Sequence, residues 1–290
     1  MSASPRIRPR ATAAARLAAA VAATAMVAGC GTEEVCPAGP RATYDLTALS
    51  STSDLATAQQ LAPAATKQIA TRAAERCATV RTGITTDGTV SNLQITAVEA
   101  TPPEGSAAKR GPLIAKYERE LTDGLKAFTT QLHRTKATSG SPVYSTIRRA
   151  IEEHADASSG TPGPLVIAQI TDGLAVERTD RGRRIDLQAA AVDPAALREM
   201  TTTLARTVEN ARVDVSVLIV GFGANSRLGD ARLNRARTIL AKTLNDAGIA
   251  VRFSRSAVPA DPARREGSRT AGGGAADQAG GAARSAGSGS

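Results

Sequence analysis

Apolar residues recur along the chain in two patterns, which predict alternating strands and helices. Short, nearly continuous apolar runs predict buried strands, whereas apolar positions three and four residues apart predict amphipathic helices. The predicted strands cover residues 42–47, 78–84, 93–98, 165–170, 213–220 and 249–253. The predicted helices cover residues 55–73, 114–132, 142–151, 194–208 and 233–244. Pro63 falls inside the first helical pattern and predicts a kink or a later start.

The order of these elements predicts the fold class. Strands that alternate with helices form parallel sheets covered on both faces. The segment Thr86-Asp87-Gly88-Thr89 separates two adjacent strands, and its Asp-Gly pair is a hairpin signal. We therefore expect an α/β fold, in which a three-layer, doubly wound and mostly parallel sheet has one antiparallel edge strand.

The N-terminus has the pattern of an export signal. Four arginines precede an alanine-rich apolar stretch over residues 17–26, which is too short for a comfortable transmembrane helix. The following Val27-Ala28-Gly29-Cys30 resembles the bacterial lipobox, in which the cysteine is acylated before cleavage. Residues 1–29 are thus predicted to be a lipoprotein signal peptide, with Cys30 as the lipid-bearing residue that anchors the chain to a membrane. The alternative is a plain secreted protein with a chance cysteine.

Composition divides the rest of the chain. Residues 30–40 form a short predicted tether, and residues 41–256 suffice for one α/β domain with a full core. Residues 257–290 are mostly Gly, Ala, Ser and Arg, so they cannot bury enough apolar surface to order themselves and are predicted to be a disordered tail. The alanine- and arginine-rich usage is typical of a high-GC Gram-positive bacterium.

Charge and cysteine content limit the partners. The formal net charge of +9 falls to +5 once the four arginines of the signal are removed, and the remaining charges of both signs are interspersed. The chain has no Trp, three Tyr and three Phe, which argues against nucleic-acid binding. Cys36 and Cys77 remain besides Cys30, and in an oxidising compartment they predict one disulfide.

Acidic and hydroxyl residues gather where predicted strands end. Asp45 and Thr47 lie at the first strand, and Thr171-Asp172-Gly173 follows a buried strand. Ser139-Gly140-Ser141 precedes a predicted helix. The carboxyl ends of parallel strands share one edge of a sheet. Carboxylate and hydroxyl oxygens converging there suit a hard divalent cation such as Mg²⁺.

Over residues 40–256 the sequence resembles the von Willebrand factor A domain. In that family the first strand ends in Asp-x-Ser-x-Ser, a loop threonine precedes a helix, and a central strand ends in Thr-Asp-Gly. The resemblance implies metal ligands at Asp45, Thr47, Ser141 and Asp172, with Mg²⁺ or Mn²⁺ bound. It also implies that the ion engages a carboxylate of a protein partner. One departure is Leu49, which has no oxygen at the third position of the first motif. Ser50 or Ser51 replaces it if the loop is longer.

These observations predict a membrane-anchored extracytoplasmic binding or adhesion module that is not an enzyme. One alternative is a structural or assembly lipoprotein with a degenerate metal site. Another is a metal-dependent enzyme, against which no general base or nucleophile stands out; His133 and His154 are isolated on predicted helices. Gly221-Phe222-Gly223 is a weak dinucleotide-loop signal, because Ser226 stands at the third glycine position. Residues 226–251 also faintly resemble the peptidoglycan-binding domain of outer-membrane protein A.

Overall fold

The computed structural model describes residues 34–36, 38–85, 90–91, 93–158 and 160–260. The predicted signal peptide, the Cys30 lipidation site, the hairpin turn at 86–89 and most of the C-terminal tail lie outside the described residues. Among the residues that are described, no helix is both long enough and apolar enough to cross a membrane.

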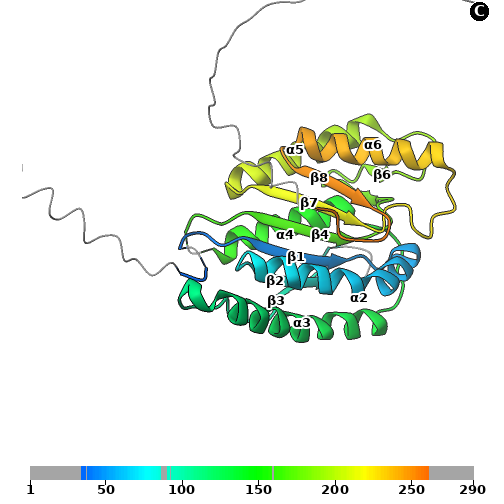
Figure 1. The fold of residues 1–290 in the computed structure, drawn as a ribbon. Coiled ribbons are helices and arrows are strands. Elements are labelled where there is room, and N and C mark those ends of the chain that lie inside the picture. The colour runs from blue at the N-terminus through cyan, green and yellow to red at the C-terminus, as the bar shows by residue number, and fades with distance from the viewer. Residues whose placement is uncertain (1–33, 37, 86–89, 92, 159, 261–290) are drawn as a thin grey trace, which may run out of the picture.

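A six-stranded sheet forms the middle layer, in the order β3-β2-β1-β4-β7-β8 (Figure 1). All neighbours pair in parallel except β3, which runs antiparallel to β2 at one edge. The strands are β1 (Thr43–Ala48), β2 (Thr79–Ile84), β3 (Ile95–Ala97), β4 (Leu165–Ile170), β7 (Val215–Val220) and β8 (Ala250–Ser254). Every residue of β1, β4 and β7 is buried, as expected for strands covered on both faces. The predicted fold class is confirmed.

Helices cover the two faces of the sheet and enclose two cores. The helices are α2 (Thr52–Glu75), α3 (Arg110–Arg134, preceded by the 3₁₀ turn Ala107–Lys109), α4 (Val143–Ala157), α5 (Pro194–Ala211) and α6 (Asp230–Asp246). Helices α2 and α3 pack on one face, where Ile69, Leu125 and Leu46 of β1 belong to one core. The other three pack on the opposite face, where Ile147, Leu204 and Ile167 of β4 belong to the second core.

Two local features differ from the sequence prediction. Helix α2 continues through Pro63 and begins earlier than predicted, at the Ser51 cap. A small two-stranded sheet also follows β4, made of β5 (Val176–Arg178) and β6 (Arg184–Asp186). These strands are three residues long and rich in charge, so they show no alternation of apolar and polar residues. The sequence pattern therefore did not predict this hairpin.

Both ends of the described chain are held against α2 and α3. Cys36 and Cys77 form a disulfide, which confirms the predicted pairing. Beside it Val35 is fully buried, and its N–H donates to the Gly105 carbonyl at 2.9 Å. At the other end Val258 is buried, and its N–H donates to Gln68 of α2 at 2.8 Å. Residues 257–260, assigned to the tail from composition, therefore pack on the domain.

Candidate functional site

Strands β1 and β4 end side by side at the carboxyl edge of the sheet, where Ala48 pairs with Ile170. Two short segments leave this edge. After β1 the chain turns at Leu49 and Ser50, and Ser51 then caps α2. After β4 it continues as Thr171-Asp172-Gly173. Ligands of open parallel sheets bind at this kind of position, because neighbouring chain ends diverge there and leave a crevice.

A cavity of about 590 Å³ opens at this edge, and we refer to it as the carboxyl-edge pocket. Its walls come from the start of α2, the loop before α4, the segment after β4, the loop after β7 and the segment after β6. The polar side chains that line it are Ser51, Thr52, Ser53, Thr138, Ser141, Asp172, Gln188, Asn225, Ser226 and Arg227. The pocket thus gathers polar side chains from five separate segments, and two of the four predicted site residues, Ser141 and Asp172, are among them.

Asp54 connects the start of α2 to the segment after β4 and is fully buried. One carboxylate oxygen accepts the Thr171 hydroxyl at 2.7 Å and the Asp172 N–H at 2.9 Å. The other accepts the Ser51 hydroxyl. Asp54 therefore fixes the positions of Ser51 and Asp172, a role that the sequence prediction missed because an aspartate in the first turn of a helix is expected as a cap.

Asp172 is the carboxylate that faces the pocket, and it is only 1% exposed. Its Oδ1 accepts the Leu174 N–H at 2.9 Å. Its Oδ2 is buried without a hydrogen-bond partner in the described structure, and so is the Ser141 hydroxyl. Burial, helped by the nearby Asp54 carboxylate, raises the pKa of Asp172 to about 7. Buried polar atoms are normally satisfied, so two unsatisfied oxygens at one pocket point to a ligand.

The loop that carries Ser141 is held from both sides. Thr138 N–H donates to the Ser50 carbonyl at 2.7 Å, which ties the loop to the end of β1. Ser141 and Val176 exchange two backbone hydrogen bonds of 2.9 and 3.0 Å, which tie it to β5. The β5–β6 hairpin therefore supports one wall of the pocket, and the loop that carries Ser141 is hydrogen-bonded both to the end of β1 and to β5.

Asp45 and Thr47, the other two predicted ligands, do not line this pocket. Asp45 is fully buried and accepts two hydrogen bonds from Arg81, at 2.7 and 2.5 Å. Burial raises the pKa of its carboxyl, and the Arg81 guanidinium opposes that rise. Thr47 is also fully buried, and its hydroxyl has no hydrogen-bond partner in the part of the chain described. Strand β1 continues to Ala48, so Asp45 stands inside the strand and not at its end.

The observed end of β1 also moves the register of the first motif. If the motif starts directly after the strand, its aspartate position falls on Leu49 and its two hydroxyl positions fall on Ser51 and Ser53. Both serines line the pocket, whereas Leu49 is fully buried in the core. The chain thus provides the hydroxyls of the motif and lacks its first carboxylate.

The remaining donors fit a hard cation with a reduced set of protein ligands. Within the described ranges, no three His, Cys, Asp or Glu side chains cluster as a metal site. The pocket offers instead one carboxylate oxygen and serine hydroxyls, including the unpartnered oxygens of Asp172 and Ser141. Oxygen ligands of this type suit Mg²⁺ or Mn²⁺, since Mg²⁺ commonly keeps several waters and takes only one or two carboxylates.

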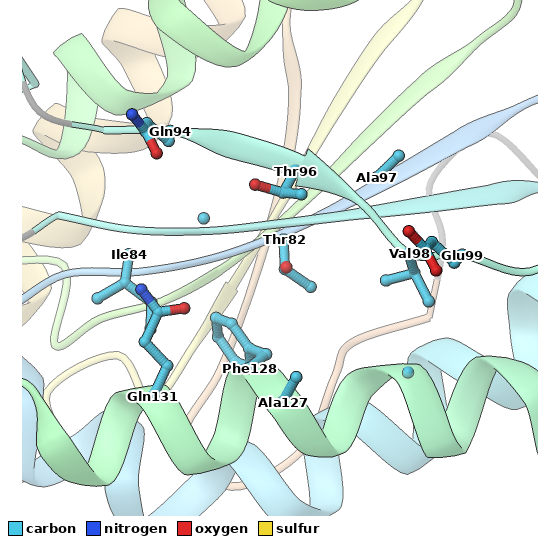
Figure 2. Close-up of a pocket in the computed structure, with 12 residues that line it drawn as sticks. Thr82, Ile84, Gln94, Thr96, Ala97, Val98, Glu99, Ala127, Phe128 and Gln131 are labelled. Carbon is cyan, nitrogen blue, oxygen red and sulfur yellow. The ribbon is translucent and has the colours of Figure 1, made fainter.

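A second cavity, of about 700 Å³, lies between β2, β3 and α3 (Figure 2). Figure 2 shows Thr82 and Ile84 of β2 facing Phe128 and Gln131 of α3. Glu99 is the one charged residue among its lining residues. None of the buried oxygens without a partner in the described residues belongs to this cavity. It therefore lacks the feature that distinguishes the carboxyl-edge pocket.

Comparisons with known proteins return structural neighbours only. No family model matches the sequence, and no curated protein matches it. The chain is similar to the pilus adhesin SpaC from Lactobacillus rhamnosus GG in its open conformation (TM-score 0.41, 9% identity), over 76% of this chain and 29% of the adhesin.

Two further neighbours have comparable scores. A von Willebrand factor type A protein from Catenulispora acidiphila has a TM-score of 0.32 at 12% identity, over 78% of this chain and 43% of that one. The manganese-loaded Plasmodium vivax TRAP protein has a TM-score of 0.35 at 12% identity, over 72% of this chain and 65% of that one. This chain spans less than a third of the first neighbour's length.

The strand order, the antiparallel edge strand and the Thr-Asp-Gly segment at the carboxyl edge carry the family resemblance in this chain itself. The described domain has the α/β fold that this resemblance implies, a mostly parallel sheet with one antiparallel edge strand.

Proposed function

We propose that this protein is a membrane-anchored, extracytoplasmic binding module that engages a protein partner through the carboxyl-edge pocket. Asp172, Ser141 and Ser53 would hold a Mg²⁺ or Mn²⁺ ion, with Ser51 placed by Asp54 beside them. The observation that carries the proposal is the pair of buried oxygens, on Asp172 and Ser141, that lack a hydrogen-bond partner in the described chain and line the same pocket.

The electrostatics of the pocket support a cation. Asp54 and Asp172 are both buried, and although Arg227 lines the pocket, no described ion pair joins a basic side chain to either carboxylate. Their proximity is one cause of the raised pKa of Asp172. A bound divalent cation supplies a positive charge and an open position for a partner's carboxylate. It would stabilise the ionised form of Asp172, so ion binding is expected to strengthen as the pH rises through about 7.

The position of the stem supports an outward-facing pocket. A disulfide is typical of exported proteins, and this one joins the stem to Cys77, just before β2 begins at the amino edge of the sheet. The pocket lies at the opposite, carboxyl edge. The five residues from the proposed lipid-bearing Cys30 to Val35 reach at most about 18 Å. A short anchor at one edge would leave the pocket directed away from the membrane.

Two observations favour the second candidate, a structural or assembly lipoprotein that needs no ion. Leu49 occupies the motif's first carboxylate position, and the Asp54 carboxylate is already engaged by Ser51, Thr171 and the Asp172 N–H. In that case the pocket would contact a partner through its polar side chains, with no ion between them.

Calorimetric titration of Mg²⁺ and then Mn²⁺ into the full chain separates the two candidates. We expect saturable binding that is lost in Asp172→Asn and weakened in Ser141→Ala. Asp123→Asn, which changes an exposed carboxylate on α3, is the matched control and should bind as the parent does. Absence of binding of both ions to the folded parent chain would refute the ion site and leave the structural candidate.

A further inference from the structure

A third cavity, lined by charged and polar side chains, lies on the α5 side of the domain, away from the carboxyl-edge pocket. It has a volume of about 390 Å³ and lies between the turn of the β5–β6 hairpin and residues 195–206 of α5. We refer to it as the arginine groove. Four arginines line it, two from the turn (Arg181 and Arg183) and two from α5 (Arg198 and Arg206).

The two acidic residues of the groove are already engaged. Asp180 accepts hydrogen bonds of 2.8 Å from Arg148 of α4. Glu199 accepts the Arg181 N–H at 2.9 Å and lies 3.7 Å from the Arg183 guanidinium. These contacts fix the turn against α4 and α5, so the groove is a built feature and not a chance approach of mobile side chains.

Three guanidinium groups remain uncompensated. Among the described residues, the side chains of Arg181, Arg198 and Arg206 have no acidic partner. All three are exposed. Arg198 and Arg206 stand eight residues apart on α5 with Thr202 midway between them, so the three follow one side of the helix, and Thr203 also lines the groove. The spacing from Arg198 to Arg206 places guanidinium groups along about two helical turns, or roughly 12 Å.

We propose that the arginine groove binds the phosphate groups of an extended polyanion. A guanidinium donates two parallel hydrogen bonds to a phosphate and stays charged at every physiological pH. The Thr203 hydroxyl adds a neutral donor, whereas the Thr202 hydroxyl already donates to the Arg198 carbonyl at 2.9 Å. Several separated guanidiniums match a ligand with repeated charges better than a single inorganic phosphate.

The position of the groove favours a polymer over a membrane surface. The groove lies on the sheet face covered by α4 and α5, whereas the stem packs with Leu113 and Ile114 of α3, which covers the opposite face. A lipid anchor on the stem therefore does not bring the groove to the membrane. Nucleic acid is also disfavoured, because no aromatic side chain lines the groove for base stacking.

The test uses the full chain and short-chain inorganic polyphosphate as the probe, at low salt. The test variant is Arg198→Gln combined with Arg206→Gln. The matched control is Arg119→Gln combined with Arg134→Gln, which removes the same charge from exposed positions on α3. We expect the test variant to weaken binding about tenfold or more and to reduce its salt dependence, whereas the control changes binding little.

Equal weakening in both double variants would overturn the proposal, because net charge alone would then explain binding. No binding of polyphosphate to the parent chain would also overturn it. Vesicles of phosphatidylglycerol and phosphatidylcholine form a parallel arm. Binding to vesicles but not to polyphosphate, lost in the groove variant, would replace the polymer with a lipid headgroup. Unchanged melting of each variant, followed by circular dichroism, confirms that the fold is intact.

Discussion

Asp45 lies within β1 and Asp172 follows the end of the neighbouring strand β4; both aspartates are buried, and the fold treats them in opposite ways. Asp45 receives a two-point hydrogen-bonded ion pair from Arg81, which also donates to the Ala150 carbonyl at 3.2 Å. Asp172 keeps one oxygen without a partner in the described structure, and the nearby Asp54 carboxylate helps to raise its pKa. The first arrangement is complete without a ligand, whereas the second lacks a positive charge.

The difference separates a structural carboxylate from a candidate ligand. A buried ion pair holds its partners in place, and removing one partner leaves an uncompensated charge in the core. An unpaired buried carboxylate costs free energy that binding of a cation recovers. Both residues are buried aspartates, so they differ in the hydrogen-bond and ion-pair partners of their carboxylates.

The largest expected effect is on Asp45. Asp45→Ala leaves the Arg81 guanidinium buried and unpaired, so we expect a loss of about 3–5 kcal/mol in the free energy of unfolding. Urea denaturation followed by circular dichroism measures it. Replacing both partners together, as Asp45→Leu with Arg81→Met, should recover most of the loss, because the uncompensated charge is then removed.

The comparison breaks down if Asp45→Ala lowers ion affinity while stability stays unchanged. Asp45 would then be a ligand as the sequence first predicted, and the Arg81 pair would not describe the ion-bound state.

A second substitution tests whether the missing carboxylate limits the ion site. Leu49→Asp removes a buried apolar side chain and adds a carboxylate near Asp172, so in a chelator the free energy of unfolding should fall by about 2–5 kcal/mol. Mg²⁺ should recover much of this loss, measured as a rise in melting temperature. Leu49→Asn, which lacks the charge, should be destabilised with little recovery. Equal recovery in both variants would contradict a carboxylate ligand at residue 49.

The sequence predicted the fold more completely than the site, and β1 shows why. Buried runs such as residues 165–170 have one interpretation as central strands, and the predicted fold class was confirmed. The end of β1 is less certain, because Ala48 and Leu49 extend its apolar pattern without a turn residue to stop it. A motif of alternating oxygens fits at two registers there, and only the observed strand end places Ser51 and Ser53 at the edge.

The contacts of Asp45 and Asp54 were beyond the sequence for a different reason. Asp45 meets Arg81 because the two residues are paired in register on adjacent parallel strands, 36 residues apart. Asp54 reaches the segment after β4, more than a hundred residues away. Such contacts depend on strand order and register, which local periodicity does not determine. Ser141 and Asp172 were predicted to lie together because both adjoin elements with clear boundaries.

A smaller effect of opposite sign is expected at Asp172. In a chelator above pH 7, Asp172→Asn removes a buried charge, so stability should stay within about 1 kcal/mol of the parent or rise. The stabilisation that Mg²⁺ gives the parent should disappear. Thermal melts with and without Mg²⁺ measure both quantities. A loss comparable to that of Asp45→Ala would instead identify Asp172 as a structural carboxylate, and the contrast between the two aspartates would fail.

Glu177 provides an intermediate case and the smallest effect. Its carboxylate is buried at the start of α4 and accepts the Tyr144 N–H at 2.8 Å and the Ser145 N–H at 3.0 Å. Burial raises its pKa to about 7, although these hydrogen bonds oppose the rise. The folded state therefore holds a proton more tightly than the unfolded state, and the stability it contributes is present below about pH 4.5 and lost as the pH rises to about 7.

The pKa of Asp172 is also about 7, so its titration would overlap with that of Glu177. To isolate Glu177, the measurement compares Asp172→Asn with the double variant Asp172→Asn/Glu177→Gln. Urea denaturation between pH 4.5 and 8 gives the free energy of unfolding of each. Asp45 is present in both proteins, so its own contribution cancels. We expect the fall in stability with rising pH to be shallower in the double variant. Identical slopes would mean that the hydrogen bonds at the start of α4 fully offset burial of Glu177. Hydrogen bonds without a cation would then suffice to satisfy a buried carboxylate. The feature that distinguishes the carboxyl-edge pocket would be the Asp172 oxygen that lacks a hydrogen-bond partner in the described residues, more than the lack of a cation paired with it.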